Sequence, residues 1–163
     1  MGKNATDLLP FLAPFPDDIK ETALWLREFV WDLYPESNEL IYDNYNALAF
    51  GFSLSDTAGD AFCSIAVFGK HINFGFNRGS ELPDEKGVLI GNGSLYRYIK
   101  VTDKVELLVM PIKKLLQLSY VNALARLKER KKPMAGQTIV KMALAKTRRP
   151  GSVPKTGKTL KRK

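Results

Sequence analysis

Apolar residues recur at helical spacing in two separate stretches of the chain. The first stretch follows Pro16 and runs to about Tyr34, where Pro35 ends it because the residue before a proline avoids helical geometry. At about 100° per residue its apolar positions share one face. They are Ile19, Ala23, Leu26, Val30 and Leu33. The second stretch begins at Pro111, and its core face consists of Ile112, Leu115, Leu116, Leu118, Ala123 and Leu127.

Between these two helices the pattern is typical of strands. Segments rich in β-branched and aromatic residues predict strands over residues 39–52, 61–68, 71–77 and 95–101. Gly69 and Lys70 join the second and third of them into a hairpin, and several glycines make 78–93 a loop. Because strands and helices do not alternate, the chain is expected to adopt an α+β fold. This fold is an antiparallel sheet of about four to five strands flanked by N-terminal and C-terminal helices.

One of these strands has two chemically different faces. Ile72, Phe74 and Phe76 alternate strictly with polar or small residues. An antiparallel sheet commonly packs one face on the core and leaves the other in contact with solvent. The polar face of this strand is therefore expected to be solvated or to face a ligand.

The charge of the chain is divided unevenly along its 163 residues. Residues 1–127 contain 12 Lys and Arg against 16 Asp and Glu, a net charge of −4. Residues 128–163 contain 13 basic residues against Glu129 alone, a net charge of +12. This asymmetry predicts an N-terminal extension over 1–15, an α+β domain over 16–130 and a basic, largely flexible C-terminal tail over 131–163.

The basic tail is a candidate for contact with nucleic acid. Phosphate neutralisation by lysine and arginine releases counterions and favours binding of polyanions. The alternative is a solvated segment that only improves solubility, and no aromatic residue beyond Tyr120 offers base stacking. The candidate contact residues are Arg130, Lys131, Lys132, Arg148, Arg149, Lys161, Arg162 and Lys163.

The chain lacks the residues that several classes of protein require. Cys63 is the single cysteine and His71 the single histidine, so the chain cannot form an internal disulfide, a thiolate metal cluster or a multi-histidine metal site. No apolar run approaches the roughly 20 residues that cross a bilayer. The first 18 residues lack the continuous apolar core of a signal peptide. A cytoplasmic location without membrane partners is expected.

The middle of the chain resembles a known family. The segments are 63–68 and 70–76, then Arg78 with Gly79, 89–93, and 97–100. Their order and spacing resemble the YdhG-like family, domains of unknown function, over about three quarters of the chain. The chain departs from the family at 42–46, where an aromatic-Gly-x-Pro turn is often found, and in its basic tail. One branch of the family is described as a frataxin-like intracellular iron chaperone, so the resemblance implies iron binding and iron–sulfur or haem assembly proteins as partners.

Carboxylates on the first helix are the candidate metal ligands. Asp17, Glu21, Glu28 and Asp32 fall on the side opposite the apolar face. Oxygen ligands suit weak binding of hard cations, iron included. The alternative is the ordinary charged surface of an amphipathic helix, and about two turns separate Glu21 from Glu28.

Four basic residues within the motifs of the resemblance form a second candidate site. His71, Arg78, Arg97 and Lys100 lie near strand ends or the glycine-rich loop. Two guanidinium groups and an ammonium can hold a carboxylate or a phosphate. The alternative is structural, with Arg97 bonding loop carbonyls or pairing with Glu81 or Asp84.

The chain is not expected to be an enzyme. The turn at Gly91 and Gly93 lacks the third glycine and the following helix of a dinucleotide site. Cys63 has the strand parity of core residues, which argues against a nucleophilic pair with His71. The leading hypothesis is a non-catalytic binding or carrier protein, an iron chaperone in its most specific form. The alternative is a nucleic-acid-associated protein that acts through its tail.

Overall fold

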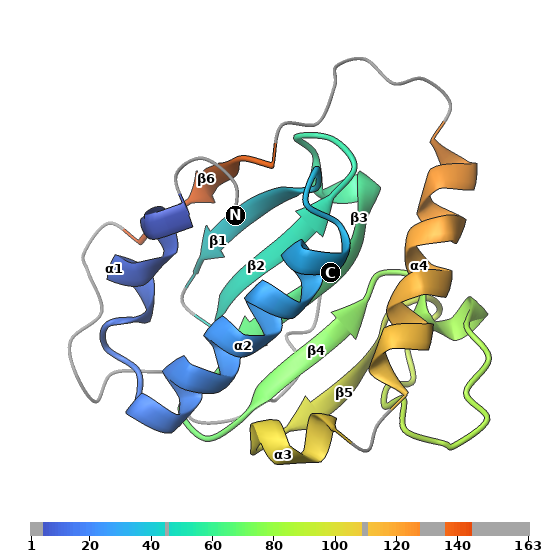
Figure 1. The fold of residues 1–163 in the computed structure, drawn as a ribbon, viewed down its shortest axis with the longest axis horizontal. Coiled ribbons are helices and arrows are strands. Elements are labelled where there is room, and N and C mark those ends of the chain that lie inside the picture. Colours follow the sequence, from blue (N-terminus) through green and yellow to red (C-terminus); the bar gives the residue numbers. More distant parts are fainter. Residues whose placement is uncertain (1–4, 45, 109–110, 128–135, 145–163) are drawn as a thin grey trace.

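A six-stranded mixed sheet forms the framework of the protein in a computed structural model (Figure 1), which describes residues 5–44, 46–108, 111–127 and 136–144. The strands are β1 (Asn38–Asp43), β2 (Leu48–Ser53), β3 (Ala61–Val67), β4 (Ile72–Phe76), β5 (Arg97–Val101) and β6 (Thr138–Met142). Their order in the sheet is β5-β4-β3-β2-β1-β6. Strands β1 to β5 pair antiparallel with their sequence neighbours, and β6 pairs parallel with β1.

The α+β class is confirmed, and the five antiparallel strands β1–β5 fit the expected four to five, whereas the parallel strand β6 was not expected. The predicted strand over 39–52 is two strands, β1 and β2, which a turn separates. The Asn44 side chain accepts hydrogen bonds from the backbone N–H groups of Asn46 and Ala47, at 3.0 and 3.1 Å. An asparagine that bonds the backbone two residues ahead is a turn signal, and it interrupts an otherwise continuous apolar run.

The helical elements agree with the two predicted helices and add shorter ones. The longer helices are α2 (Asp17–Leu33) and α4 (Ile112–Arg126). The shorter elements are η1 (Ala5–Leu8), α1 (Leu9–Leu12), η2 (Ala58–Asp60), η3 (Gly79–Glu81) and α3 (Lys104–Leu107). Asp18 accepts a hydrogen bond from the Ile19 backbone N–H at 2.9 Å in the first turn of α2. No helix among the described residues is long and apolar enough to cross a membrane.

One face of the sheet carries the hydrophobic core. In register across the strands lie Ile41, Phe50, Ile65, Phe74 and Ile99, each 0–1% exposed. Helices α2 and α4 lie on this side (Figure 1), and their buried residues belong to the same cluster as the five strand residues. Burial of large apolar side chains against two helices stabilises the sheet from this side.

The segment before α2 also contributes to the core. Leu8, Leu12 and Phe15 are 0–3% exposed and pack in the same cluster as α2. The first 15 residues, which sequence patterning separates as an extension, therefore belong to the folded domain from at least Leu8 onward.

Strand β6 corrects the predicted boundary between domain and tail. The sequence predicts a largely flexible tail over 131–163, but Thr138–Met142 is the sixth strand of the sheet. The Thr138 hydroxyl donates to the Glu39 carboxylate at 2.9 Å, and Arg27 of α2 donates to both oxygens of that carboxylate, at 2.6 and 2.7 Å. This buried Arg27–Glu39–Thr138 cluster joins α2, β1 and β6. The domain thus extends past residue 130.

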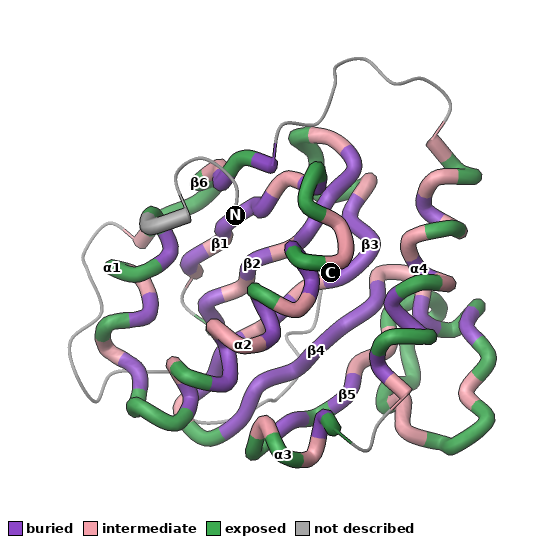
Figure 2. Tube along the Cα trace, in the orientation of Figure 1, coloured by how far each residue is buried: buried purple, intermediate pink, exposed green. Residues whose placement is uncertain are grey.

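The opposite face of the sheet, here called the open face, carries small and polar residues, tyrosines and the buried Leu40. One row across the strands is Leu40, Gly51, Ser64, Gly75 and Tyr98. The next row is Tyr42, Ala49, Ala66, Asn73 and Lys100. Figure 2 shows β4 buried over its whole length, including the positions that point to the open face.

Candidate functional site

Two of the four predicted anion-binding residues have structural partners. The Arg97 guanidinium donates to the backbone carbonyls of Gly93 and Tyr96, at 2.6 and 2.8 Å. Arg78 pairs with the Glu81 carboxylate at 2.7 Å. The structural interpretation of Arg97, which bonds loop carbonyls, is confirmed. Arg78 rather than Arg97 takes Glu81 as its partner.

The other two residues come together on the open face. His71 directly precedes β4 and is 5% exposed, and its ring stacks on Phe68 with centroids 4.7 Å apart and planes 15° apart. Burial, together with the nearby ammonium of Lys100, lowers the pKa of His71 below its ordinary value. Because a neutral imidazole can both donate and accept a hydrogen bond, His71 can serve a ligand in either way at neutral pH.

Asn73 lies on the same face and was not among the predicted site residues. It pairs across the strands with Ala66 on β3 and with Lys100 on β5. Asn73 is 8% exposed, and its Oδ1 is buried without a hydrogen bond from any described residue. A buried polar atom without a partner costs roughly 1–3 kcal/mol. Such an atom is therefore a candidate ligand contact.

Two tyrosines complete this part of the open face. The rings of Tyr96 and Tyr98 lie 6.0 Å apart between centroids, with planes 27° apart. Tyr96 covers Gly75, because a Cβ built on Gly75 meets the Tyr96 hydroxyl at 2.1 Å and the Tyr96 ring at 2.6 Å. Only glycine at position 75 leaves room for the ring.

The five residues His71, Asn73, Tyr96, Tyr98 and Lys100 are called the β4–β5 patch below. It combines an acceptor, a neutral imidazole, a cation and two aromatic rings. Sequence alternation over 71–77 indicated the face, but the contribution of β5 depends on the strand register, which pairs Asn73 with Lys100 and Gly75 with Tyr98.

The open face also lacks acidic side chains at the paired positions of the six strands. The acidic residues of these strands are Glu39 and Asp43, which alternate with the open-face positions and are 0% and 4% exposed. Glu39 points into the Arg27–Glu39–Thr138 cluster. Lys100 is exposed on the open face, so this face favours a ligand with negative charge.

The four candidate metal ligands on α2 are exposed, and two of them have cationic partners. Asp17 pairs with Lys20 at 3.1 Å, and Glu21 pairs with Lys104 of α3. From Asp17 to Asp32 the helix advances roughly 22 Å along its axis. Within the described part of the chain, no group of three or more acidic, histidine or cysteine side chains is placed to hold a metal ion.

The geometry of Cys63 separates it from His71. Cys63 is 0% exposed and lies in register with Phe52 on the core face, and burial raises the pKa of its thiol well above the ordinary value. His71 has the parity of the open face. A thiol and an imidazole on opposite sides of a sheet cannot form a nucleophilic pair.

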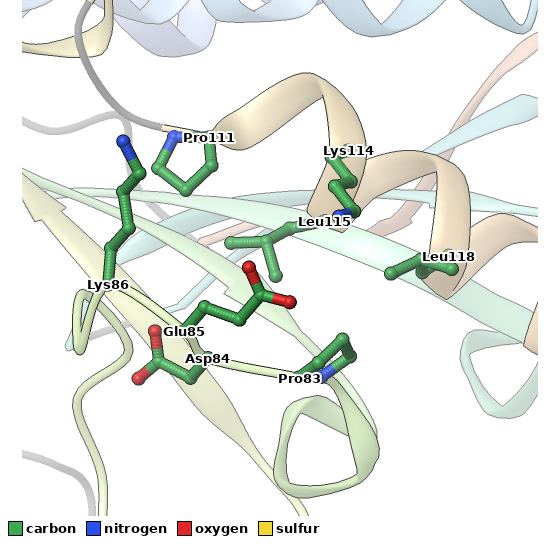
Figure 3. Close-up of a pocket in the computed structure, with 8 residues that line it drawn as sticks. All are labelled: Pro83, Asp84, Glu85, Lys86, Pro111, Lys114, Leu115 and Leu118. Carbon is green, nitrogen blue, oxygen red and sulfur yellow. The ribbon is translucent and has the colours of Figure 1, made fainter.

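A separate small cavity lies between the glycine-rich loop and the start of α4 (Figure 3). Its volume is about 160 Å³, and its lining includes Asp84, Lys86 and Lys114. Both Asp84 carboxylate oxygens accept backbone N–H groups, from Val88 at 2.8 Å and Leu89 at 3.0 Å. The cavity is smaller than the several hundred Å³ typical of ligand pockets, and Asp84, one of its two acidic residues, holds the loop.

Comparisons with known proteins leave the family open. No family model matches the chain, and no curated protein or solved structure matches it significantly.

The candidate nucleic-acid residues fall at 130–132, 148–149 and 161–163, outside the described residues.

Proposed function

We propose that the protein is a non-catalytic binding protein whose ligand surface is the β4–β5 patch. The observation that carries the proposal is the Asn73 side chain, 8% exposed, with a buried Oδ1 that accepts no hydrogen bond from the described residues. Buried polar atoms in folded proteins are nearly always paired, and either an ordered water or a ligand can supply the partner that Oδ1 lacks. A ligand with an N–H or O–H donor would satisfy Oδ1.

The rest of the patch narrows the chemistry of the ligand. Lys100 provides an exposed ammonium for a negatively charged group, and Tyr98 provides an aromatic surface. The patch contains neither a carboxylate nor a thiol, and its imidazole, ammonium and phenol groups can all donate hydrogen bonds to a ligand. These features support binding of a ligand with acceptor groups. A cytoplasmic location is part of the same proposal.

The family assignment supports a binding role only as a resemblance. Membership of the YdhG-like family is proposed from the motifs around His71, Arg78 and Arg97, and the iron-chaperone activity, with its iron–sulfur or haem assembly partners, rests on that resemblance alone. An anaerobic titration with ferrous iron tests it. Saturable binding that disappears in the double variant Glu21→Ala, Asp32→Ala supports iron transfer through α2.

The binding proposal is tested by two-dimensional NMR with adenosine monophosphate and inorganic phosphate as separate probes. We expect adenosine monophosphate to shift the side-chain amide signals of Asn73 and the backbone signals of Tyr98 and Lys100. Inorganic phosphate is expected to shift Lys100 alone. Variant Lys100→Ala should weaken both effects, whereas Lys113→Ala on α4 should leave them unchanged. Shifts confined to α2, or none at the patch, contradict the proposal.

A further inference from the structure

We infer that the open face binds a segment of single-stranded nucleic acid, with a base stacked on Tyr98 and a phosphate beside Lys100. The inference rests on the proposed function, because it names the ligand class of the same β4–β5 patch. It moves the nucleic-acid contact from the basic tail, where the sequence suggested it, to the folded domain.

The tyrosine pair is the first reason for this choice. Tyr96 is 37% exposed and Tyr98 is half-buried, so both rings lie at the surface of the open face. Sheet faces that recognise single strands stack unpaired bases on aromatic side chains. The Tyr96 ring packs directly on Gly75, and this contact holds the Tyr96 ring beside the Tyr98 ring.

Asn73 provides the second reason, because it matches the edge of a base. Unstacked bases are recognised through hydrogen bonds to their Watson–Crick and Hoogsteen edges. An exocyclic amino group of a base would donate to the unpartnered Asn73 Oδ1. Next to Asn73 on β3 lie Ser64 and Ala66, both half-buried and both with short side chains.

Charge complementarity is the third reason. The body over residues 1–127 has a net charge of −4, yet the paired positions of the open face hold no carboxylate. This face has no carboxylate at its paired positions and exposes Lys100 on the edge strand β5, whereas the rest of the body is acidic. A phosphodiester backbone should therefore bind this face in preference to the other surfaces of the domain. The chain's own basic segment 128–163 is the alternative occupant of this face. It contains a single acidic residue, Glu129, and no aromatic residue, so it matches Lys100 and the tyrosines less well than a nucleic acid does.

The test is a titration of the full-length chain with a fluorescent single-stranded DNA of mixed sequence, at several salt concentrations. Tyr98→Leu removes a stacking surface and should raise Kd about 5- to 150-fold, the range for loss of one base stack. Lys100→Ala should reduce the salt dependence by about 0.7 in slope, the share of one phosphate contact with a single strand. Tyr42→Leu, on β1 of the same face and about 14 Å from Asn73 by strand spacing, is the matched control with a smaller effect. Thermal melting confirms that each variant is folded.

The variant Gly75→Ala is a second test of the proposed contact between the tyrosine rings and a base. It keeps every tyrosine but displaces the Tyr96 ring from its seat. The variant should therefore weaken DNA binding while leaving the Lys100 salt dependence unchanged. Because the change lies at the surface ring rather than at the core, the fold is expected to persist.

The possible outcomes separate the alternatives. Binding that depends on salt but not on Tyr98 or Gly75 assigns the contact to the basic tail and overturns the inference. Equal competition by polyphosphate, which has no bases, does the same. A concentration-dependent dimer that Tyr98→Leu dissociates assigns the face to a second copy. If adenosine monophosphate shifts Asn73 but DNA does not bind, the binding proposal stands and only the nucleic-acid inference fails.

Discussion

At position 73 the asparagine is expected to lower the stability of the fold while it provides a contact for the ligand. A buried amide oxygen without a partner destabilises a fold, and asparagine is a poor strand residue. We therefore expect Asn73→Val to raise the free energy of unfolding by about 1 kcal/mol in urea denaturation while it abolishes ligand-induced shifts at the patch. Stabilised variants that lose binding are typical of functional positions.

Asn38 provides the matched control for this prediction. Its side chain donates to the Ser55 carbonyl at 3.2 Å and accepts from the Gln137 N–H at 3.1 Å. Asn38→Val should therefore destabilise the protein by roughly 1–3 kcal/mol, because both partners lose a hydrogen bond. Equal losses in the two variants would mean that Asn73 has a partner after all.

His71 should make the stability of the protein sensitive to mild acid. Burial, with Lys100 nearby, lowers its pKa in the folded state, so the unfolded chain binds the proton more readily. The folded state is therefore fully stable above the unfolded pKa of about 6.5 and loses stability as the pH falls below it.

Since His71 is the chain's single histidine, one proton NMR titration reads its pKa directly. We expect a midpoint below about 6.5. The melting temperature should fall less steeply between about pH 7 and pH 5 in His71→Gln than in the wild type. A midpoint above the ordinary value would indicate a nearby anion and contradict the described surroundings.

At single positions the sequence located two of the five residues of the β4–β5 patch, His71 and Lys100. Strict alternation over 71–77 placed His71 on a polar face, and motif order placed Lys100 near it. The roles of Arg78 and Arg97 depend on loop conformation, since Arg97 bonds carbonyls four residues and one residue away. The lack of a partner at Asn73 cannot be inferred from a chain pattern, because it depends on every neighbour in space.

Among the elements, β6 depends on the buried Arg27–Glu39–Thr138 cluster. Arg27 and Glu39 are 4% and 0% exposed, and the Arg27 guanidinium also lies 4.9 Å from the Trp31 ring centroid. Removing one partner of a buried ion pair leaves the other charge without compensation.

Arg27→Met should accordingly lower the free energy of unfolding by about 3–5 kcal/mol in urea denaturation. The double variant Arg27→Met, Glu39→Leu should recover much of this loss, because it leaves no isolated charge. A double variant as unstable as the single one would show that packing around Trp31, not charge, dominates at this position.

The elements that the sequence predicted are those with regular periodicity. The apolar spacing of α2 and α4 and the hairpin β3–β4 give a repeating signal, and the structure confirms them. The turn between β1 and β2 was missed because an aromatic-rich run continues through it. Strand β6 was missed because a short apolar run inside a basic segment has no periodicity of its own, and pairing with β1 decides its conformation.

For the whole molecule, composition and pattern predicted the α+β class but not the pairing of β6 with β1. The order β5-β4-β3-β2-β1-β6 places the last strand beside the first, and no local signal along the chain specifies such a pairing. The division into an acidic body and a basic end remains a property of the sequence. The structure adds that the acidic side chains of the strands, Glu39 and Asp43, lie on the core side of the sheet.

The position of β6 has a consequence for the order in which the protein can assemble during synthesis. Thr138 meets Glu39 across 99 residues, so β1 keeps an unpaired edge, and Arg27 and Glu39 lack their third partner, until residues 138–142 have left the ribosome. Contacts so distant along the chain form late, and exposed strand edges recruit other chains meanwhile. The nascent protein is therefore most vulnerable to aggregation just before β6 emerges.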